Sequence, residues 1–88
     1  MAYLVHERDV HLVGADGQTY SRVRAYAREM PGGTWESWLE LINDAGEIVT
    51  TDRETTQSTQ EEVAYWATGL ETAYLEGALR RALEVRSR

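Results

Sequence analysis

The sequence predicts an α+β domain, in which an antiparallel meander sheet of three to four strands is covered on one face by a C-terminal helix. Residues 18–29 and 34–42 alternate between apolar and polar side chains, which is the period of a strand with one buried face. Residues 58–88 instead repeat their apolar side chains at helical spacing. No other segment has the apolar surface to cover the sheet, so the helix is expected to supply half of the core.

The first predicted hairpin covers residues 3–29. Two apolar pieces within residues 3–13 flank a polar run at 6–9, which fits either one bulged strand or two short strands. The turn at residues 14–17 ends in Asp-Gly, a pair that tolerates positive φ. In the following strand Val23, Ala25 and Ala27 share one face with Ser21, and His11 is expected opposite Tyr20. The other face carries Tyr20, Arg22, Arg24, Tyr26 and Arg28.

The second hairpin turns at residues 30–33, where Pro31 and two glycines interrupt the alternation. A turn centred on Gly32 pairs opposite charges and aromatic rings across the two strands. The predicted pairs are Arg28–Glu36, Tyr26–Trp38 and Arg24–Glu40. A register shifted by one residue would move the arginines onto the apolar face, where Leu39 and Leu41 lie. After a turn at 43–46, residues 47–54 form the last predicted strand.

The predicted helix covers approximately residues 59–86. Ser58 and Glu61 have the spacing of a capping box, and four arginines, the last of them Arg88, lie near the C-terminal end. The apolar stripe comprises Val63, Trp66, Ala67, Leu70, Tyr74, Gly77 and Ala78. Gly69 is unfavourable inside a helix, so the sequence leaves open whether the helix is continuous or broken near Gly69.

This alternative decides the role of Leu75, Leu79 and Leu83, which lie away from the first part of the stripe. In a continuous helix these leucines would face solvent or a second chain, and an exposed row of leucines marks an interface. We therefore predict a homodimer, or a partner docked on the leucines, for the continuous helix. A break near Gly69 would instead return the leucines to the core.

Composition limits the classes of function. The 88 residues are long enough for one domain, predicted to span residues 1–88, with strands within 3–54. There is no cysteine, no apolar run of membrane-spanning length and no recognisable signal peptide, which predicts a cytoplasmic protein. The net charge of −6 argues against broad nucleic-acid binding, which needs a basic surface.

No catalytic motif is recognisable, and the chain is not predicted to be an enzyme. Nucleophile–base pairs, phosphate-binding glycine loops and metal-binding helix motifs are all missing from the sequence. His6 and His11 are not spaced as metal ligands, and the hydroxyl-rich residues 50–60 are explained by capping of the following helix. We accordingly predict no catalytic, cofactor-binding or metal-binding residues.

The candidate interaction surface combines the polar sheet face with the helix leucines. Its members are Tyr20, Arg22, Arg24, Tyr26, Arg28, Trp38, Leu75 and Leu79. Exposed Trp, Tyr and Arg are typical anchors of protein interfaces, so the predicted function is a non-enzymatic protein-interaction module that binds a partner or itself. Two alternatives remain open: binding of a small anionic ligand or single-stranded nucleic acid through the Tyr/Arg stripe, and a merely solvated face.

One part of the chain resembles a known family. The segment Glu54-Thr55-Thr56-Gln57, followed by Tyr65-Trp66-Ala67, Gly69-Leu70-Glu71 and residues 74–79 (YLEGAL), is similar to a small family of uncharacterised bacterial domains. The resemblance covers the last strand and the helix, about a third of the chain. It implies a bacterial source, and it implies neither a substrate nor site residues.

Overall fold

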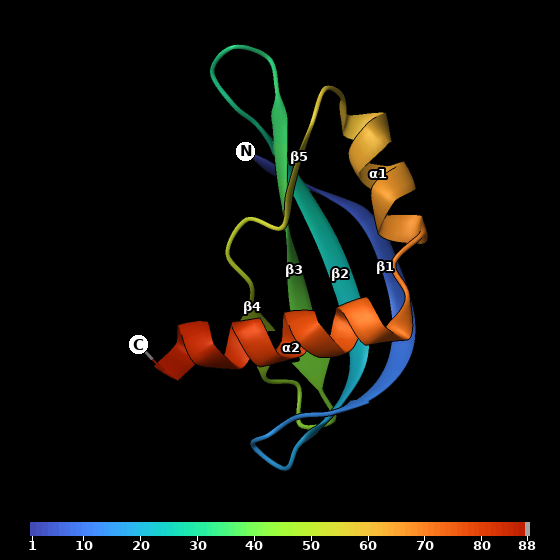
Figure 1. The fold of residues 1–88 in the computed structure, drawn as a ribbon, viewed down its shortest axis with the longest axis vertical. Coiled ribbons are helices and arrows are strands. Elements are labelled where there is room, and N and C mark those ends of the chain that lie inside the picture. Colours follow the sequence, from blue (N-terminus) through green and yellow to red (C-terminus); the bar gives the residue numbers. More distant parts are fainter. Residues whose placement is uncertain (88) are drawn as a thin grey trace.

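The computed structural model describes residues 1–87; Arg88, expected at the C-terminal end of the helix, lies outside the described residues. The predicted α+β fold is confirmed: both helices pack on the same face of an antiparallel sheet (Figure 1). The elements are β1 (Ala2–Val13), β2 (Thr19–Glu29), β3 (Trp35–Asn43), β4 (Ile48–Thr50), β5 (Thr55–Gln57), α1 (Gln60–Thr68) and α2 (Thr72–Ser87).

The strands follow the order β1-β2-β3-β4, and β5 also pairs with β3. The last predicted strand, residues 47–54, is therefore interrupted. The backbone N–H groups of Thr51 and Glu54 donate to carbonyls of β3 at 2.9 and 2.7 Å, while residues 52–53 depart from the sheet between them. The Thr51 hydroxyl accepts a hydrogen bond from Leu39 N–H at 3.0 Å. This bond satisfies the β3 backbone between its pairing with β4 and its pairing with β5.

The predicted register of β2 against β3 is confirmed residue by residue. Arg28 lies opposite Glu36, Tyr26 opposite Trp38 and Arg24 opposite Glu40. The turn between these strands has positive φ at Gly32 and Gly33, conformations that side chains rarely adopt. The inner face, toward the helices, carries the buried residues Val23, Ala25, Ala27, Leu39 and Leu41.

The prediction for Tyr20 is wrong. The register of β2 against β3 shifts between Tyr20 and Arg22, so Ser21 is an extra residue and the alternation reverses there. Tyr20 consequently points inward and is fully buried. β1 is one bulged strand with two register shifts, and these shifts place Leu12, not His11, opposite Tyr20.

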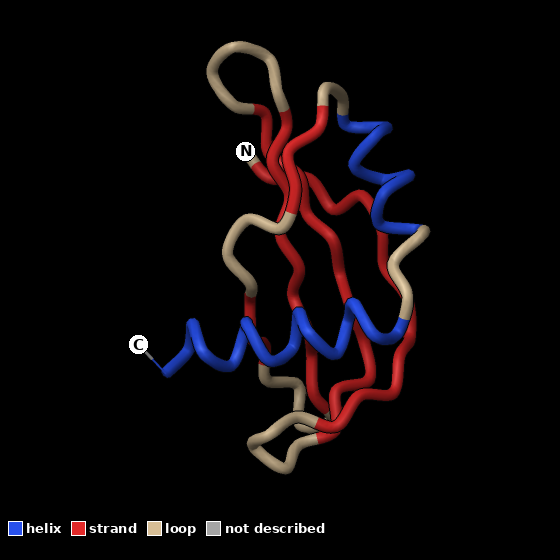
Figure 2. The backbone as a smooth tube through the Cα atoms, in the orientation of Figure 1, coloured by secondary structure: helices blue, strands red, loops and turns tan. Residues whose placement is uncertain are grey.

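The helix is broken near Gly69, which settles the alternative that the sequence left open. α1 ends at Thr68 and is capped by Gly69, and a short connection leads into α2, which runs across the strands (Figure 2). The N-cap is Thr59, whose hydroxyl accepts a hydrogen bond from Glu62 N–H at 3.1 Å. The predicted cap, Ser58, is one residue too early. Both choices have the same Ser/Thr-to-Glu spacing, which is why the sequence did not separate them.

The break returns the leucines to the core, as one of the two alternatives predicted. Leu75 and Leu79 are only 2% and 3% exposed and pack with Ala78 and Ala82 against the sheet. The prediction that Leu75 and Leu79 are exposed members of the interaction surface is therefore wrong, because both side chains are buried in the core. Trp66 is half-buried at the margin of the same core. Within residues 1–87, neither helix has the length and apolar character needed to cross a bilayer.

Replacing Leu79 by alanine tests this placement. Truncation of a fully buried leucine removes its transfer free energy and leaves a cavity, so the free energy of unfolding should fall by about 2–5 kcal/mol. Chemical denaturation measures the change. Tyr65, on the solvent side of α1, is 82% exposed, and Tyr65→Ala is the matched control, with an expected change within about 0.5 kcal/mol. Equal stability of the two variants would contradict the orientation of α2.

Gly14 tests the contact between the β1–β2 turn and α2. A Cβ at Gly14 would lie 2.4 Å from Asp16 Oδ1, 3.1 Å from the Tyr20 ring and 3.3 Å from Leu83 Cδ1. Gly14→Ala should therefore destabilise the domain by about 1–3 kcal/mol, as overpacking does. At Gly69 the nearest atom to an added Cβ is 3.7 Å away, so Gly69→Ala should leave the melting temperature unchanged or raise it. A tolerated Gly14→Ala would show that the turn does not pack this closely.

Candidate interaction face

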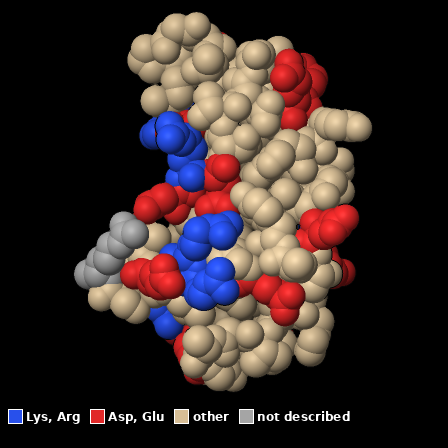
Figure 3. Space-filling view, in the orientation of Figure 1, with Lys and Arg blue, Asp and Glu red and all other residues tan. Residues whose placement is uncertain are grey.

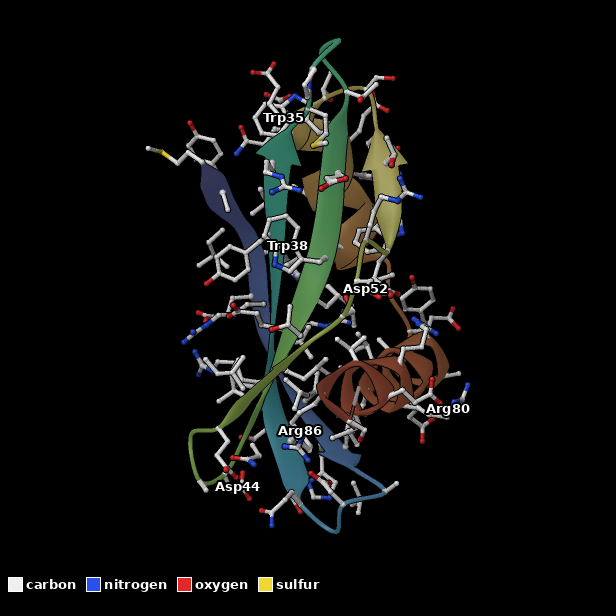
Figure 4. The ribbon with its side chains drawn as sticks, turned by 90° about the vertical axis from the view of Figure 1, so that its left-hand side faces the viewer. Trp35, Trp38, Asp44, Asp52, Arg80 and Arg86 are labelled. Carbon is white, nitrogen blue, oxygen red and sulfur yellow. The ribbon has the colours of Figure 1, made fainter. Side chains whose placement is uncertain are left out.

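The structure brings five of the eight predicted surface residues together on the sheet face that the helices leave uncovered, here called the outer face. These are Arg22, Arg24, Tyr26, Arg28 and Trp38. In Figure 4, Trp38 lies on one side of the sheet and α2 on the other. Tyr20, Leu75 and Leu79 belong to the core and take no part in this face.

An apolar row crosses the middle of the outer face. It runs from Leu4 in β1 through Tyr26 in β2 to Trp38 in β3, which are direct cross-strand partners. The Tyr26 and Trp38 rings stack with centroids 6.1 Å apart and an interplanar angle of 14°. Leu4 is half exposed, and the sequence did not indicate it because the bulges of β1 decide which residue meets Tyr26. The row gives the face a continuous apolar centre.

Ion pairs hold the arginines of the outer face in place. Arg28 pairs with Glu36, and its guanidinium lies 5.7 Å from the centre of the Trp38 ring, within the range of a cation–π contact. The centre of the face is thus an aromatic ring with a fixed guanidinium above it.

The other two arginines pair across the first hairpin. Arg22 contacts Glu7 at 3.2 Å and Asp9 at 3.1 Å, and Arg24 contacts Glu7 at 2.5 Å. The hydrogen bond from Arg24 is the main cause that lowers the pKa of Glu7, and the same bond raises the pKa of Arg24. The sequence paired Arg24 with Glu40. That backbone register is right, but the guanidinium turns toward β1, whose placement the sequence did not fix.

Two charged residues of the outer face are left without a partner among residues 1–87. Neither Glu40 nor Arg53 forms a side-chain ion pair or hydrogen bond there, and the two carry opposite charges. The charged residues of β1, β2 and β3 that point to this face, together with Arg53 of the pocket, are four arginines and four carboxylates. They are Arg22, Arg24, Arg28 and Arg53, and Glu7, Asp9, Glu36 and Glu40. The face is therefore electrically neutral, although the chain has a net charge of −6.

A shallow pocket adjoins Trp38 at the β4–β5 side of this face. Its volume is about 260 Å³, and its lining comprises Arg28, Glu36, Trp38, Thr50, Thr51 and Arg53. Arg53 reaches the pocket because residues 52–53 leave the edge of the sheet between β4 and β5. An unpaired guanidinium can bind a carboxylate, and the indole ring beside it can contact an apolar group of the same ligand.

On the opposite face, a second charged cluster joins the segment before β5 to α2. The Glu54 carboxylate, 6% exposed, receives hydrogen bonds from Tyr74 Oη at 2.7 Å and from Arg81. The guanidinium of Arg81 lies 5.3 Å from the centre of the Tyr74 ring, and the Tyr74 and Trp66 rings form a T-shaped pair with an interplanar angle of 89°. Figure 3 shows acidic and basic side chains side by side on this face. Because all three polar groups satisfy one another, this cluster serves as a structural tie between the sheet edge and α2.

The remaining predicted features provide no site. His6 and His11 are not part of any group of three or more potential ligands, and residues 1–87 contain no such group that could hold a metal ion. His11 lines a cavity of about 410 Å³ between β1 and the start of α2, with Arg8, Asp9 and Glu71. The guanidinium of Arg8 donates to the Leu70 carbonyl, so its charge already serves the end of α1.

Comparison with known proteins finds no family model, no curated protein and no solved structure that matches this chain.

Tyr74 provides a test of the structural tie. Burial and the hydrogen bond to Glu54 raise the pKa of Tyr74 from 10.0 to about 12. The unfolded chain then loses this proton at lower pH than the folded chain, so stability should fall as the pH rises from about 10 to about 12. Tyr74→Phe should show a smaller alkaline loss in urea denaturation, and Tyr65→Phe should behave as the parent does. An alkaline profile unchanged by Tyr74→Phe would mean that burial and the bond to Glu54 do not raise the pKa of Tyr74 in this way.

Proposed function

We propose that this chain is a non-enzymatic protein-interaction module that binds its partner through the outer face. The observation that carries the proposal is the open row of Leu4, Tyr26 and Trp38, framed on both sides by ion-paired arginines. Protein interfaces have this composition: an apolar, aromatic centre surrounded by a polar rim. Trp, Tyr and Arg are also the residues that contribute most when an interface forms.

The contacts within the face favour binding in a second way. The Trp38 ring is held between stacking by Tyr26 and the guanidinium of Arg28. Side chains fixed before association lose less rotamer entropy on binding, so more of the interaction energy appears as affinity. A merely solvated face needs no such arrangement.

Charge favours a protein over a nucleic acid or another anion. Arg22, Arg24 and Arg28 each pair with a carboxylate of the same face, so a phosphate that binds them would have to displace Glu7, Asp9 or Glu36. Arg53 offers an unpaired guanidinium, but a single charge is far less than the basic surface that a nucleic-acid strand requires. The counterion release that drives nucleic-acid binding needs an excess of basic charge, which this neutral face does not have. The anionic ligand or single strand remains the alternative function.

Site-specific photocrosslinking in the cells that produce the protein tests the proposal. A photoreactive amino acid in place of Leu4 or Tyr26 should yield a discrete crosslinked protein, which mass spectrometry identifies. The same amino acid in place of Tyr65, which is exposed on α1, is the control and should not yield that product.

Affinity of the identified partner for the purified chain then separates the two functions. An interface with an apolar centre should weaken only slightly as salt is raised, whereas an arginine–phosphate complex weakens steeply. No crosslink at either outer-face position, or a crosslink to nucleic acid with steep salt dependence, would contradict the proposal.

A further inference from the structure

We infer that the partner of the outer face is a second copy of this chain, packed face to face about a twofold axis close to Trp38. The inference rests on the proposed function of that face. It follows from the two unpaired charges, Glu40 and Arg53, which make the face complementary to itself.

The positions of the two charges fit an arrangement in which one surface meets its own copy. Glu40 follows Trp38 by two residues along β3 and points to the same face. Arg53 lines the pocket beside Trp38, together with Arg28. Glu40 lies opposite Thr50, which lines this same pocket, so Glu40 and Arg53 are neighbours on the face. A twofold axis that runs between them in the plane of the interface brings Glu40 of each copy to Arg53 of the other. In a twofold interface each such contact forms twice.

Neutrality of the face removes the main obstacle to self-association. Two chains of net charge −6 repel one another, and that repulsion is smallest where the contacting surfaces carry no net charge. The outer face carries its four positive and four negative groups in balance, so the excess acidity lies elsewhere on the chain. Like charges in direct contact across the interface would lower the affinity, whereas the proposed arrangement brings opposite charges, Glu40 and Arg53, together.

Pairing through an open edge of the sheet is the other route to self-association, and neither edge suits it. β4 and β5 form one edge and are only three residues long each, and β1 forms the other. Two register shifts within Ala2–Val13 bend the strand, and bulges of this kind protect edges from pairing. Arg8 points inward to the end of α1. Face-to-face packing avoids these obstacles, because two sheets stack about 10 Å apart with the helices of both copies outside.

Sedimentation equilibrium of the full chain, up to millimolar concentration, tests the inference. The wild type should show a monomer–dimer equilibrium. Glu40→Arg and Arg53→Glu should each raise the dissociation constant about tenfold or more, because each brings like charges together across the axis. The double variant should restore the constant to within about threefold of the wild type, since the exchanged charges again attract.

Matched controls are Glu76→Arg and Arg80→Glu, the same charge changes at exposed positions of α2, which should leave dimerisation unchanged. Trp38→Ala removes the central ring and should raise the dissociation constant about thirtyfold or more. Circular dichroism of every variant checks whether it is folded. If Trp38→Ala does not fold, the two charge reversals and their combination still decide the matter, because both residues lie at the surface.

The outcomes distinguish this inference from the proposed function. A wild type that stays monomeric at millimolar concentration overturns the second copy as partner, while a crosslink from Leu4 or Tyr26 to another protein would leave the interaction module intact. A dimer that survives both charge reversals, or a double variant that is not restored, overturns the twofold arrangement. A dimer that crosslinks from Tyr65 and not from Tyr26 contradicts both.

Discussion

The pairing of β2 with β3 in a single register is the constraint on which both faces of the domain depend. Because side chains alternate, this register puts Ala25 beside Leu39 on the inner face and Tyr26 beside Trp38 on the outer face. The small alanines allow α1 and α2 to approach the sheet closely, and the large rings are directed away from the helices. A slip of one residue would bury the arginines and expose the core residues. The backbone hydrogen bonds between β2 and β3 therefore determine both the core and the candidate interaction face.

Two irregularities of the strands change which face some side chains occupy. The extra residue at Ser21 turns Tyr20 inward, where its hydroxyl donates to Asp16 at 2.8 Å and helps to fix the first turn beneath α2. The departure of residues 52–53 from the sheet edge brings Arg53 to the outer pocket while Glu54, the next residue, points to α2. Each irregularity thus assigns neighbouring residues to different layers, which a regular strand would not do.

Local patterns were enough to predict the strands, the turns, the β2–β3 register and the inner face from the sequence. They were not enough where the outcome depends on distant parts of the chain. Gly69 weakens a helix in any context, but only the packing of α2 on the sheet shows that Leu75 and Leu79 become core. Arg24 has carboxylates available on both neighbouring strands, and the bulged path of β1 decides in favour of Glu7. Regular alternation assigns Tyr20 to the outer face, but the extra residue at Ser21 puts it on the inner face. A single extra residue of this kind cannot be recognised from the sequence pattern.

We propose that the outer face, with Trp38 at its centre, is where this domain contacts another molecule, and that a second copy fits it. A dilution series of ¹H–¹⁵N correlation spectra tests this most directly, because the three tryptophans each give one indole N–H resonance. The account predicts that the Trp38 resonance shifts progressively with protein concentration, whereas the Trp66 resonance, on the helix-covered face, stays in place. A Trp66 resonance that moves while that of Trp38 remains fixed would contradict the outer face as the contact surface. Three resonances that are all independent of concentration would contradict the second copy as its partner.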